Sequence, residues 1–321
     1  MKILLFISIL VNSLLCYSQV DTLLQNKIQK LRKEKQYNNV INILTEDIED
    51  NKNNLWYNYQ LACYYSLIAD TINSFNYLYK SIDLGADGKD ILTDTDFDNI
   101  HNCREWKNIV DTLEDIYLIK NPNITDKKLA IELWHMYIDD QRFRTLSKNY
   151  KKEFPKFGTS EYEKIQEEQE RIIVHNKKRL KIIIKQKGWP TYSMVGKDAG
   201  DAVFYVFQHA EYKYLKKYLP YLKQAAIKGE ASKANYAKMY DRYLMRSGKK
   251  QCYGTQIVSS GTIDKEGNYQ RGVMQFHPIA EYETVNKRRA EMDLPPIEEY
   301  AKKMKVVYNP NANIKLHKFK H

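Results

Sequence analysis

Residues 55–85 read LWYNYQLACYYSLIADTINSFNYLYKSIDLG and decide the architecture of the N-terminal part of the chain. The stretch predicts one helix over residues 55–69 and a second over residues 71–84. Gly85 follows as a residue suited to the left-handed position that ends many helices. The small side chain of Ala62 would let the two helices pack closely against each other. We therefore expect a helical hairpin in this region.

An earlier segment aligns with this hairpin at a spacing of about 34 residues, the period of one family of helical repeats. The alignment pairs Lys27, Ile28, Leu31, Val40 and Leu44 with Leu61, Ala62, Tyr65, Ser74 and Leu78. Such a period of paired helices resembles the tetratricopeptide repeat. A third helical piece is expected over residues 96–119. The resemblance implies a short tetratricopeptide-like helical hairpin array over residues 19–120 that binds a protein or peptide partner; a spacer or docking collar is the alternative.

The charge composition changes abruptly near residue 121. Residues 19–120 carry 11 Lys and Arg against 17 Asp and Glu, whereas residues 121–321 carry 39 against 23. This break predicts two units with a boundary near Asn121-Pro122-Asn123. The positive excess of the second unit favours an anionic small molecule or a glycan as ligand, although lysines can also serve only to keep helix surfaces solvated. We expect no nucleic-acid partner, because the chain has no recognition motif.

The first 18 residues have the features of a secretory signal peptide. Lys2 precedes a short apolar run over residues 3–11, and Cys16-Tyr17-Ser18 places small side chains where a signal peptidase recognises them. The run is too short for a comfortable membrane span, and no later segment is a candidate for one. We expect cleavage after Ser18 and an exported protein, periplasmic or extracellular. A lipid-bearing Cys16 and an uncleaved anchor are the alternatives.

Three cysteines remain after this cleavage, namely Cys63, Cys103 and Cys252. They have neither the number of a disulfide framework nor the spacing of a metal site. We expect no metal and no cofactor.

Residues 121–305 are expected to form a helical domain with one β-hairpin, which makes the whole chain mainly α. Helices are predicted over residues 129–146, 161–187, 198–217, 232–247, 285–292 and from 297 onward. The strands of the hairpin, at about residues 251–277, are predicted over 251–258 and 269–276. Gly254 inside the first strand indicates the close approach of another backbone or of a ligand. Residues 306–321 are expected to be a loose tail.

Asp241 is the most informative single residue of this domain. It falls on the apolar face of the 232–247 helix, with Ala234, Ala237 and Leu244. A buried carboxylate needs a partner, because its desolvation otherwise costs several kcal/mol. Arg242 points away from it on the helix, so we expect the partner to be Arg288, Arg289, His209 or a tyrosine. A structural ion pair and a catalytic or ligand-orienting acid are both consistent with this pattern.

Polar residues that do not fit a simple solvated surface define the candidate site. They are Asp140, Gln141, Gln208, His209, Asp241, Arg242, Gln251, Tyr253, Thr255, Gln256, Arg288 and Arg289. The leading interpretation is ligand binding, in which glutamines recognise amide or hydroxyl groups and arginines hold negative charge. The alternative is a hydrolase or transferase in which His209 and Asp241 act as an acid/base pair.

The order of these motifs resembles a bacterial family of unknown function, over about residues 125–302. The resemblance is carried by Asp140-Gln141, Gly188-Trp189-Pro190, Val195-Gly196, Gln208-His209-Ala210, Asp241-Arg242, Gln251-x-Tyr253-Gly254-Thr255-Gln256, Asn286-x-Arg288-Arg289, Leu294 and Tyr300. It implies a site shared with that family and does not name the chemistry of the site.

Overall fold

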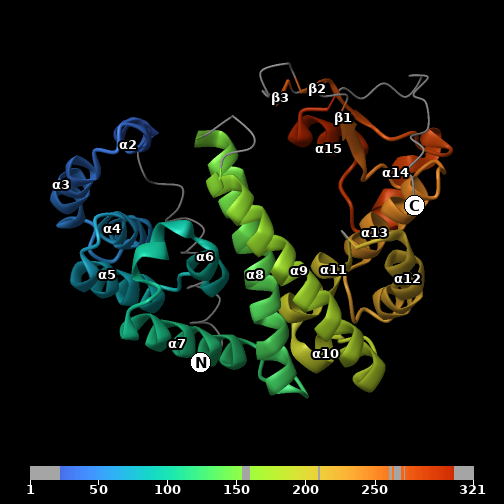
Figure 1. Ribbon diagram of the computed structural model, residues 1–321, viewed down its shortest axis with the longest axis horizontal. Coiled ribbons are helices and arrows are strands. Elements are labelled where there is room, and N and C mark those ends of the chain that lie inside the picture. Colours follow the sequence, from blue (N-terminus) through green and yellow to red (C-terminus); the bar gives the residue numbers. More distant parts are fainter. Residues whose placement is uncertain are drawn as a thin grey trace, which may run out of the picture. The chain divides into compact units, whose positions relative to one another are not determined.

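The computed structural model in Figure 1 describes residues 22–153, 160–208, 210–259, 262–263, 269–270 and 272–306. The predicted signal peptide with Cys16, His209 and residues 307–321 of the predicted tail lie outside the described residues. The chain divides into two compact units, Met1–Lys120 and Asn121–His321. Within the described part, none of the helices combines the length and the apolar character needed to cross a bilayer. The prediction of a mainly α-helical fold is confirmed.

The N-terminal unit is an array of paired helices. Its elements are α2 (Thr22–Lys33), α3 (Tyr37–Ile48), α4 (Leu55–Leu67), α5 (Thr71–Asp83), α6 (Gly88–Thr93), η1 (Thr95–Ile100) and α7 (Arg104–Lys120). Residues of α2, α3 and α4, among them Ile28, Leu44 and Leu61, share one hydrophobic core. The helix expected over residues 96–119 is wrong as a single element. The Asp94 side chain caps η1 by accepting a hydrogen bond from the Asp96 N–H, and a turn at residues 101–103 separates η1 from α7.

The hairpin of α4 and α5 forms as expected from its sequence. Asn54 caps α4 and Asp70 caps α5, each by accepting a hydrogen bond from a backbone N–H of the first turn. Ala62 is fully buried, and the Ser74 hydroxyl donates a hydrogen bond of 2.9 Å to the Ala62 carbonyl. Gly85 after α5 adopts the left-handed conformation, with φ +95°. The small side chain at Ala62 therefore sets the close approach of the two helices.

We predict that Ala62→Leu destabilises this hairpin by roughly 1–3 kcal/mol, because the extra carbons overpack a closed contact. Hydrogen exchange over residues 55–83 measures the loss as faster exchange of α4 and α5. Ile72→Ala on α5 is the control, because Ile72 is 74% exposed. Equal exchange in the two variants would contradict the packing role of Ala62.

The C-terminal unit combines helices with short antiparallel strands. Its helices are α8 (Lys127–Glu153), α9 (Ser160–Lys187), α10 (Tyr192–Val195), α11 (Lys197–Gln208), α12 (Tyr212–Ile227), α13 (Lys233–Arg246), η2 (Tyr282–Thr284), α14 (Val285–Glu291) and α15 (Ile297–Met304). Strand β1 (Ile257–Ser259) pairs with β4 (Met274–Phe276), and β2 (Thr262–Ile263) pairs with β3 (Tyr269–Gln270). The predicted β-hairpin is present, with shorter strands.

Helices α8, α9 and α11 pack against one another, and α8 and α9 lie side by side in Figure 1. The Asp126 N–H donates a hydrogen bond of 2.9 Å to the Met194 carbonyl, and the rings of Tyr137 and Tyr205 lie 5.2 Å apart. Met194 follows Asp126 by the same number of sequence positions as Tyr205 follows Tyr137. Helices α8 and α11 therefore run in the same direction, and Asp140 lies level with Gln208, the last residue of α11.

The single helix expected over residues 198–217 is wrong. Helix α11 ends at Gln208, and α12 begins at Tyr212. Arg242 and Arg246 of α13 donate hydrogen bonds to the carbonyls of Gln208 and Ala210, respectively. The last carbonyls of a helix have no partner within it, and here guanidinium groups supply the donors. This break places the end of α11 against α13.

Candidate functional site

The segment Gln251–Gln256 is a loop wrapped around the carboxylate of Asp241. The Asp241 side chain is fully buried. One of its oxygens accepts hydrogen bonds from the N–H groups of Cys252 at 2.7 Å and Tyr253 at 3.0 Å. The other accepts from the Thr255 N–H at 3.0 Å and the Thr255 hydroxyl at 2.9 Å. The loop therefore presents its donors to one buried acceptor.

Two arginines of α14 hold the opposite, carbonyl side of the same loop. Arg289 is fully buried and donates to the Tyr253 carbonyl at 2.6 Å and to the Pro295 carbonyl at 2.6 Å. Arg288 donates to the Cys252 carbonyl at 2.9 Å. The guanidinium of Arg289 also lies 5.1 Å from the centre of the Tyr300 ring, a cation–π distance. The loop is thus bound through both sides of its peptide groups.

The expected side-chain partner of Asp241 is therefore wrong. No arginine, histidine or tyrosine side chain pairs with this carboxylate among the described residues, and backbone N–H groups do so instead. Burial raises the pKa of the Asp241 carboxyl, and the hydrogen bonds from Tyr253, Thr255 and Cys252 oppose that rise. The carboxylate is sealed from solvent, and both of its oxygens are bound by the loop.

This loop replaces the strand expected over residues 251–258, because side chains bind the backbone N–H groups of the segment. The Gln251 side chain is fully buried; its oxygen accepts from the Gln256 N–H at 2.8 Å, and its amide donates to the carbonyls of Gln256 and His277. Side chains thus take the N–H groups that a neighbouring strand would need. Only Ile257–Ser259 remain a strand.

Gly254 is needed for the shape of the loop. Its φ is +69°, and a Cβ added to it would lie 2.5 Å from Cδ1 of Ile297 and 3.0 Å from Cδ1 of Ile279. The neighbours of Gly254 are therefore isoleucine side chains, and not another backbone or a ligand as the sequence predicted.

We predict that Asp241→Asn destabilises the C-terminal unit by at least about 3 kcal/mol, because the amide turns an N–H group toward buried donors and removes a buried charge. The midpoint of urea unfolding measures the loss. Glu299→Gln, an exposed acid on α15, serves as the control for the removal of one negative charge. An Asp241→Asn midpoint equal to that of the control would refute the structural role.

Gly254→Ala should be far more destabilising than Gly229→Ala. Both glycines have a left-handed φ, +69° and +73°, but no atom lies within 4 Å of a Cβ built on Gly229. Gly229→Ala therefore incurs only the conformational cost of about 1–2 kcal/mol, whereas Gly254→Ala adds overpacking of roughly 1–3 kcal/mol. Urea unfolding of both variants measures the difference, and equal losses would show that the isoleucines do not constrain Gly254.

A second group of predicted residues meets at the end of α11. Asp140 of α8 is buried and accepts two hydrogen bonds from Arg144, at 2.7 and 3.0 Å, and one from the Gln141 amide at 2.7 Å. Arg242 donates to the Gln208 carbonyl at 2.9 Å and to the Gln256 side-chain oxygen at 2.9 Å. We call Arg144, Arg242 and Arg246 the arginine cluster.

The electrostatics of this cluster are unusual. Burial, Arg246 and Arg144 together lower the pKa of the Arg242 guanidinium to about 10. Burial also lowers the pKa of Arg246, which forms no ion pair with a described residue. Like charges in a partly buried position raise the free energy of the charged state. The geometry can therefore hold an anion through planar guanidinium groups.

Ten of the twelve predicted residues thus separate into two groups. Asp241, Gln251, Thr255, Arg288 and Arg289 build the loop. Asp140, Gln141, Gln208, Arg242 and Gln256 lie around the end of α11, whereas Tyr253 faces elsewhere and His209 is outside the described residues. Sequence reasoning missed Arg144 and Arg246. Their positions four residues after Asp140 and Arg242 would have been the signal.

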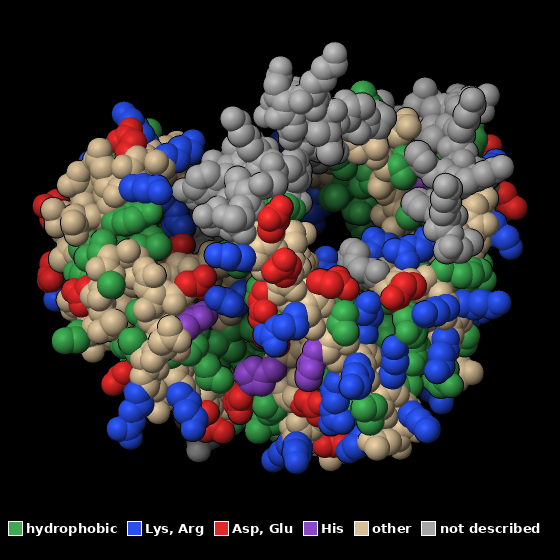
Figure 2. All heavy atoms as spheres, viewed as in Figure 1, with side chains coloured by type: hydrophobic (Ala, Val, Ile, Leu, Met, Phe, Trp, Pro, Cys, Tyr) green, Lys and Arg blue, Asp and Glu red, His purple; other side chains and the backbone are tan. Residues whose placement is uncertain are grey.

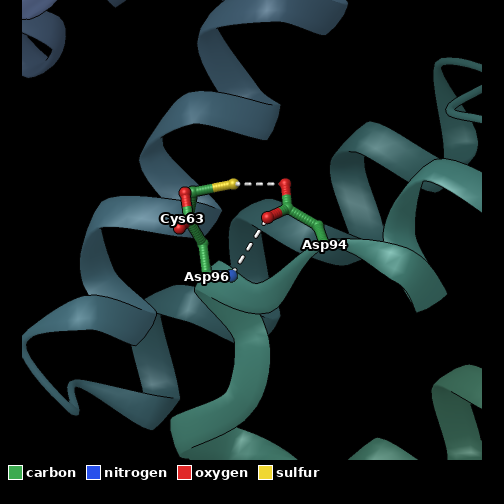
Figure 3. Close-up of side chains that lie close together, drawn as sticks. All are labelled: Cys63, Asp94 and Asp96. Carbon is green, nitrogen blue, oxygen red and sulfur yellow. Dashed lines mark hydrogen bonds between the residues drawn. The ribbon is translucent and has the colours of Figure 1, made fainter. Parts of the chain in front are cut away.

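The N-terminal unit has its own cluster of potential ligands, shown in Figure 3. The ligand atoms of Cys63, Asp94 and Asp96 all lie within 4.8 Å of one another. Arg32 already binds both oxygens of Asp96, at 2.6 and 2.7 Å. Asp94 caps η1 and accepts a hydrogen bond from the Tyr59 hydroxyl at 3.0 Å. Burial raises the pKa of the Cys63 thiol well above its usual value. The contacts of these three residues with Arg32, Tyr59 and η1 explain why they lie together, and no metal is needed for it.

Comparison with known proteins gives one match. Residues 161–312 match a family described as "Family of unknown function (DUF6624)". No curated protein and no solved structure matches the chain. The expected resemblance to a family of unknown function is confirmed for this segment, which begins after Asp140 and Gln141. The likeness of residues 19–120 to a tetratricopeptide repeat stays a prediction.

Proposed function

We propose that the C-terminal unit binds a small anionic ligand, carrying a phosphate, sulfate or carboxylate group, at the arginine cluster. The observation that carries this proposal is that Arg242 and Arg246 meet at the end of α11, with Arg144, the partner of Asp140, close enough to lower the pKa of Arg242. Planar guanidinium groups bind such anions in bidentate fashion. Burial and, after it, repulsion from Arg246 and Arg144 lower the pKa of Arg242, and a bound anion would offset that repulsion.

The positive charge of the unit as a whole supports the same ligand class. Residues 121–321 carry 39 Lys and Arg against 23 Asp and Glu. Figure 2 shows many Lys and Arg side chains, with some acidic ones among them, on the visible face of the unit. Helix α12 carries the exposed Lys213, Lys216 and Lys217. Charges of this kind raise the local concentration of anions and speed their association.

A capping role is the competing explanation for Arg242 and Arg246, because both donate to carbonyls at the end of α11. The partial negative charge of a helix C-terminus corresponds to only about half an elementary charge. It does not offset two guanidinium groups, so capping alone leaves an excess of positive charge.

Catalysis by Asp241 and His209 has less support. Both oxygens of Asp241 accept hydrogen bonds from the loop, and the side chain is fully buried. An acid or base must reach the atom whose proton it transfers. Binding is therefore the function that we put forward.

The test is the binding of inorganic phosphate to the full chain, measured by calorimetry at constant ionic strength. We expect wild type to bind, and Arg242→Gln and Arg246→Gln each to weaken the affinity about tenfold, the equivalent of one charged hydrogen bond. Arg171→Gln is the control; it removes the same charge from the same unit at a side chain that is 73% exposed. An equal loss in all three variants, or no binding by wild type, would refute the site.

A further inference from the structure

A cavity of about 420 Å³ lies beside the loop, and its walls come from α12, α13, α14 and the loop itself. Tyr236 and Tyr240 of α13 and Cys252 and Tyr253 of the loop line it. Its volume lies in the range of small-molecule pockets, which are mostly apolar with a few polar groups. Among the described residues of the predicted site, Tyr253 alone lines this cavity.

The tyrosine rings form a corner. The rings of Tyr236 and Tyr240 stack with their centres 5.8 Å apart and their planes at 16°. Tyr253 meets Tyr240 with a centre-to-centre distance of 6.2 Å and an interplanar angle of 63°. Aromatic rings prefer offset-stacked and edge-to-face neighbours. A flat ring placed in this corner can stack on one tyrosine and meet the edge of the other.

The polar ends of these tyrosines have no hydrogen-bond partner in the part of the chain that the structure describes. Among the described residues, no group forms a hydrogen bond with the phenol oxygen of Tyr236, Tyr240 or Tyr253. Burial raises the pKa of all three phenols, that of Tyr236 to about 12. Each phenol therefore keeps its proton near neutral pH and can donate a hydrogen bond.

Charged side chains complete the lining. Lys223 of α12 and Lys233 of α13 line the cavity, and neither forms an ion pair with a residue that the structure describes. Glu291 also lines it. Two ammonium groups against one carboxylate leave a positive charge beside an apolar corner. A neutral apolar ligand would not pair with that charge, whereas an anionic ligand would.

We propose that this cavity is a second binding site, for a small molecule that combines a flat ring with an anionic group. The ring packs into the corner of Tyr240 and Tyr253, the phenols donate hydrogen bonds to its oxygens, and Lys223 and Lys233 hold its charge. The site is separate from the arginine cluster. Residues two apart on a helix, such as Tyr240 and Arg242, point to opposite sides of α13.

Cys252 supplies a readout that is specific for this cavity. Its side chain is partly exposed and lines the cavity, whereas Cys63 is buried and Cys103, in the N-terminal unit, is partly exposed. Alkylation by iodoacetamide, quantified for each peptide by mass spectrometry, reports how accessible each thiol is. Burial raises the pKa of the Cys252 thiol, so the reaction is run at mildly alkaline pH. Cys103 is the internal control.

The probe is p-nitrophenyl sulfate, added to the full chain in excess inorganic phosphate so that the arginine cluster is already filled. At roughly ten times its Kd, the probe should slow Cys252 alkylation about tenfold and leave Cys103 unchanged. Inorganic sulfate at the same concentration should protect neither thiol. No protection of Cys252 up to roughly 10 mM probe, or equal protection by inorganic sulfate, would overturn the proposal.

Variants separate the ring from the charge. The double variant Lys223→Gln/Lys233→Gln, altered at exposed positions, should raise the Kd of p-nitrophenyl sulfate about tenfold and leave that of neutral p-nitrobenzyl alcohol unchanged. Tyr240→Ala should weaken the binding of both compounds. Tyr221→Ala, at an exposed tyrosine of α12 outside the cavity, should change the affinity of neither compound. Unchanged affinity in the lysine variant would overturn the anionic class. If phosphate fails to bind the arginine cluster, the alkylation of Cys252 still reports on the cavity, so the two proposals can fail separately.

Discussion

The buried carboxylate of Asp241 organises the C-terminal unit. It accepts hydrogen bonds from the N–H groups of Cys252, Tyr253 and Thr255, and so converts a stretch with strand-forming residues into a closed loop. Burying an ion costs several kcal/mol unless hydrogen bonds replace its hydration. The loop supplies those bonds, and Arg289 binds the carbonyl side of the same peptide groups. Carboxylate and guanidinium therefore stabilise one loop conformation without touching each other.

The loop contributes different side chains to the two sides of α13. It directs Cys252 and Tyr253 toward the tyrosine-lined cavity. It also places the Gln256 side chain against Arg242, at the end of α11. Neither surface is continuous in sequence, since α12, α13, α14 and the loop contribute to the first and α8, α11 and α13 to the second. A loop held in one conformation would keep Tyr253 and Gln256 at fixed positions relative to the helices that complete each surface.

The balance of charge distinguishes structural from functional polar groups in this unit. Asp241 of α13 and Arg289 of α14 bury one charge of each sign against the same loop, and both bind its peptide groups through hydrogen bonds. The arginine cluster has two guanidinium groups beyond the pair of Arg144 and Asp140. The tyrosine-lined cavity likewise has two lysines against one glutamate. A local excess of cationic side chains at a concave or partly buried position is the electrostatic feature that attracts an anionic ligand.

The sequence by itself determined most of the helices, the α4–α5 hairpin, the break in charge near residue 121 and the burial of Asp241. Each of these follows from local pattern, such as the spacing of apolar residues, capping positions and Gly85. Only the tertiary structure decided what Asp241 binds, where α11 ends and which residues meet across helices. The backbone N–H groups of a distant loop leave no periodic signal. The spacing of four residues between Arg242 and Arg246, or between Tyr236 and Tyr240, does not tell which segments these side chains meet. Their contacts depend on how packed helices bring remote segments together, which is a property of the folded chain and not of any local stretch.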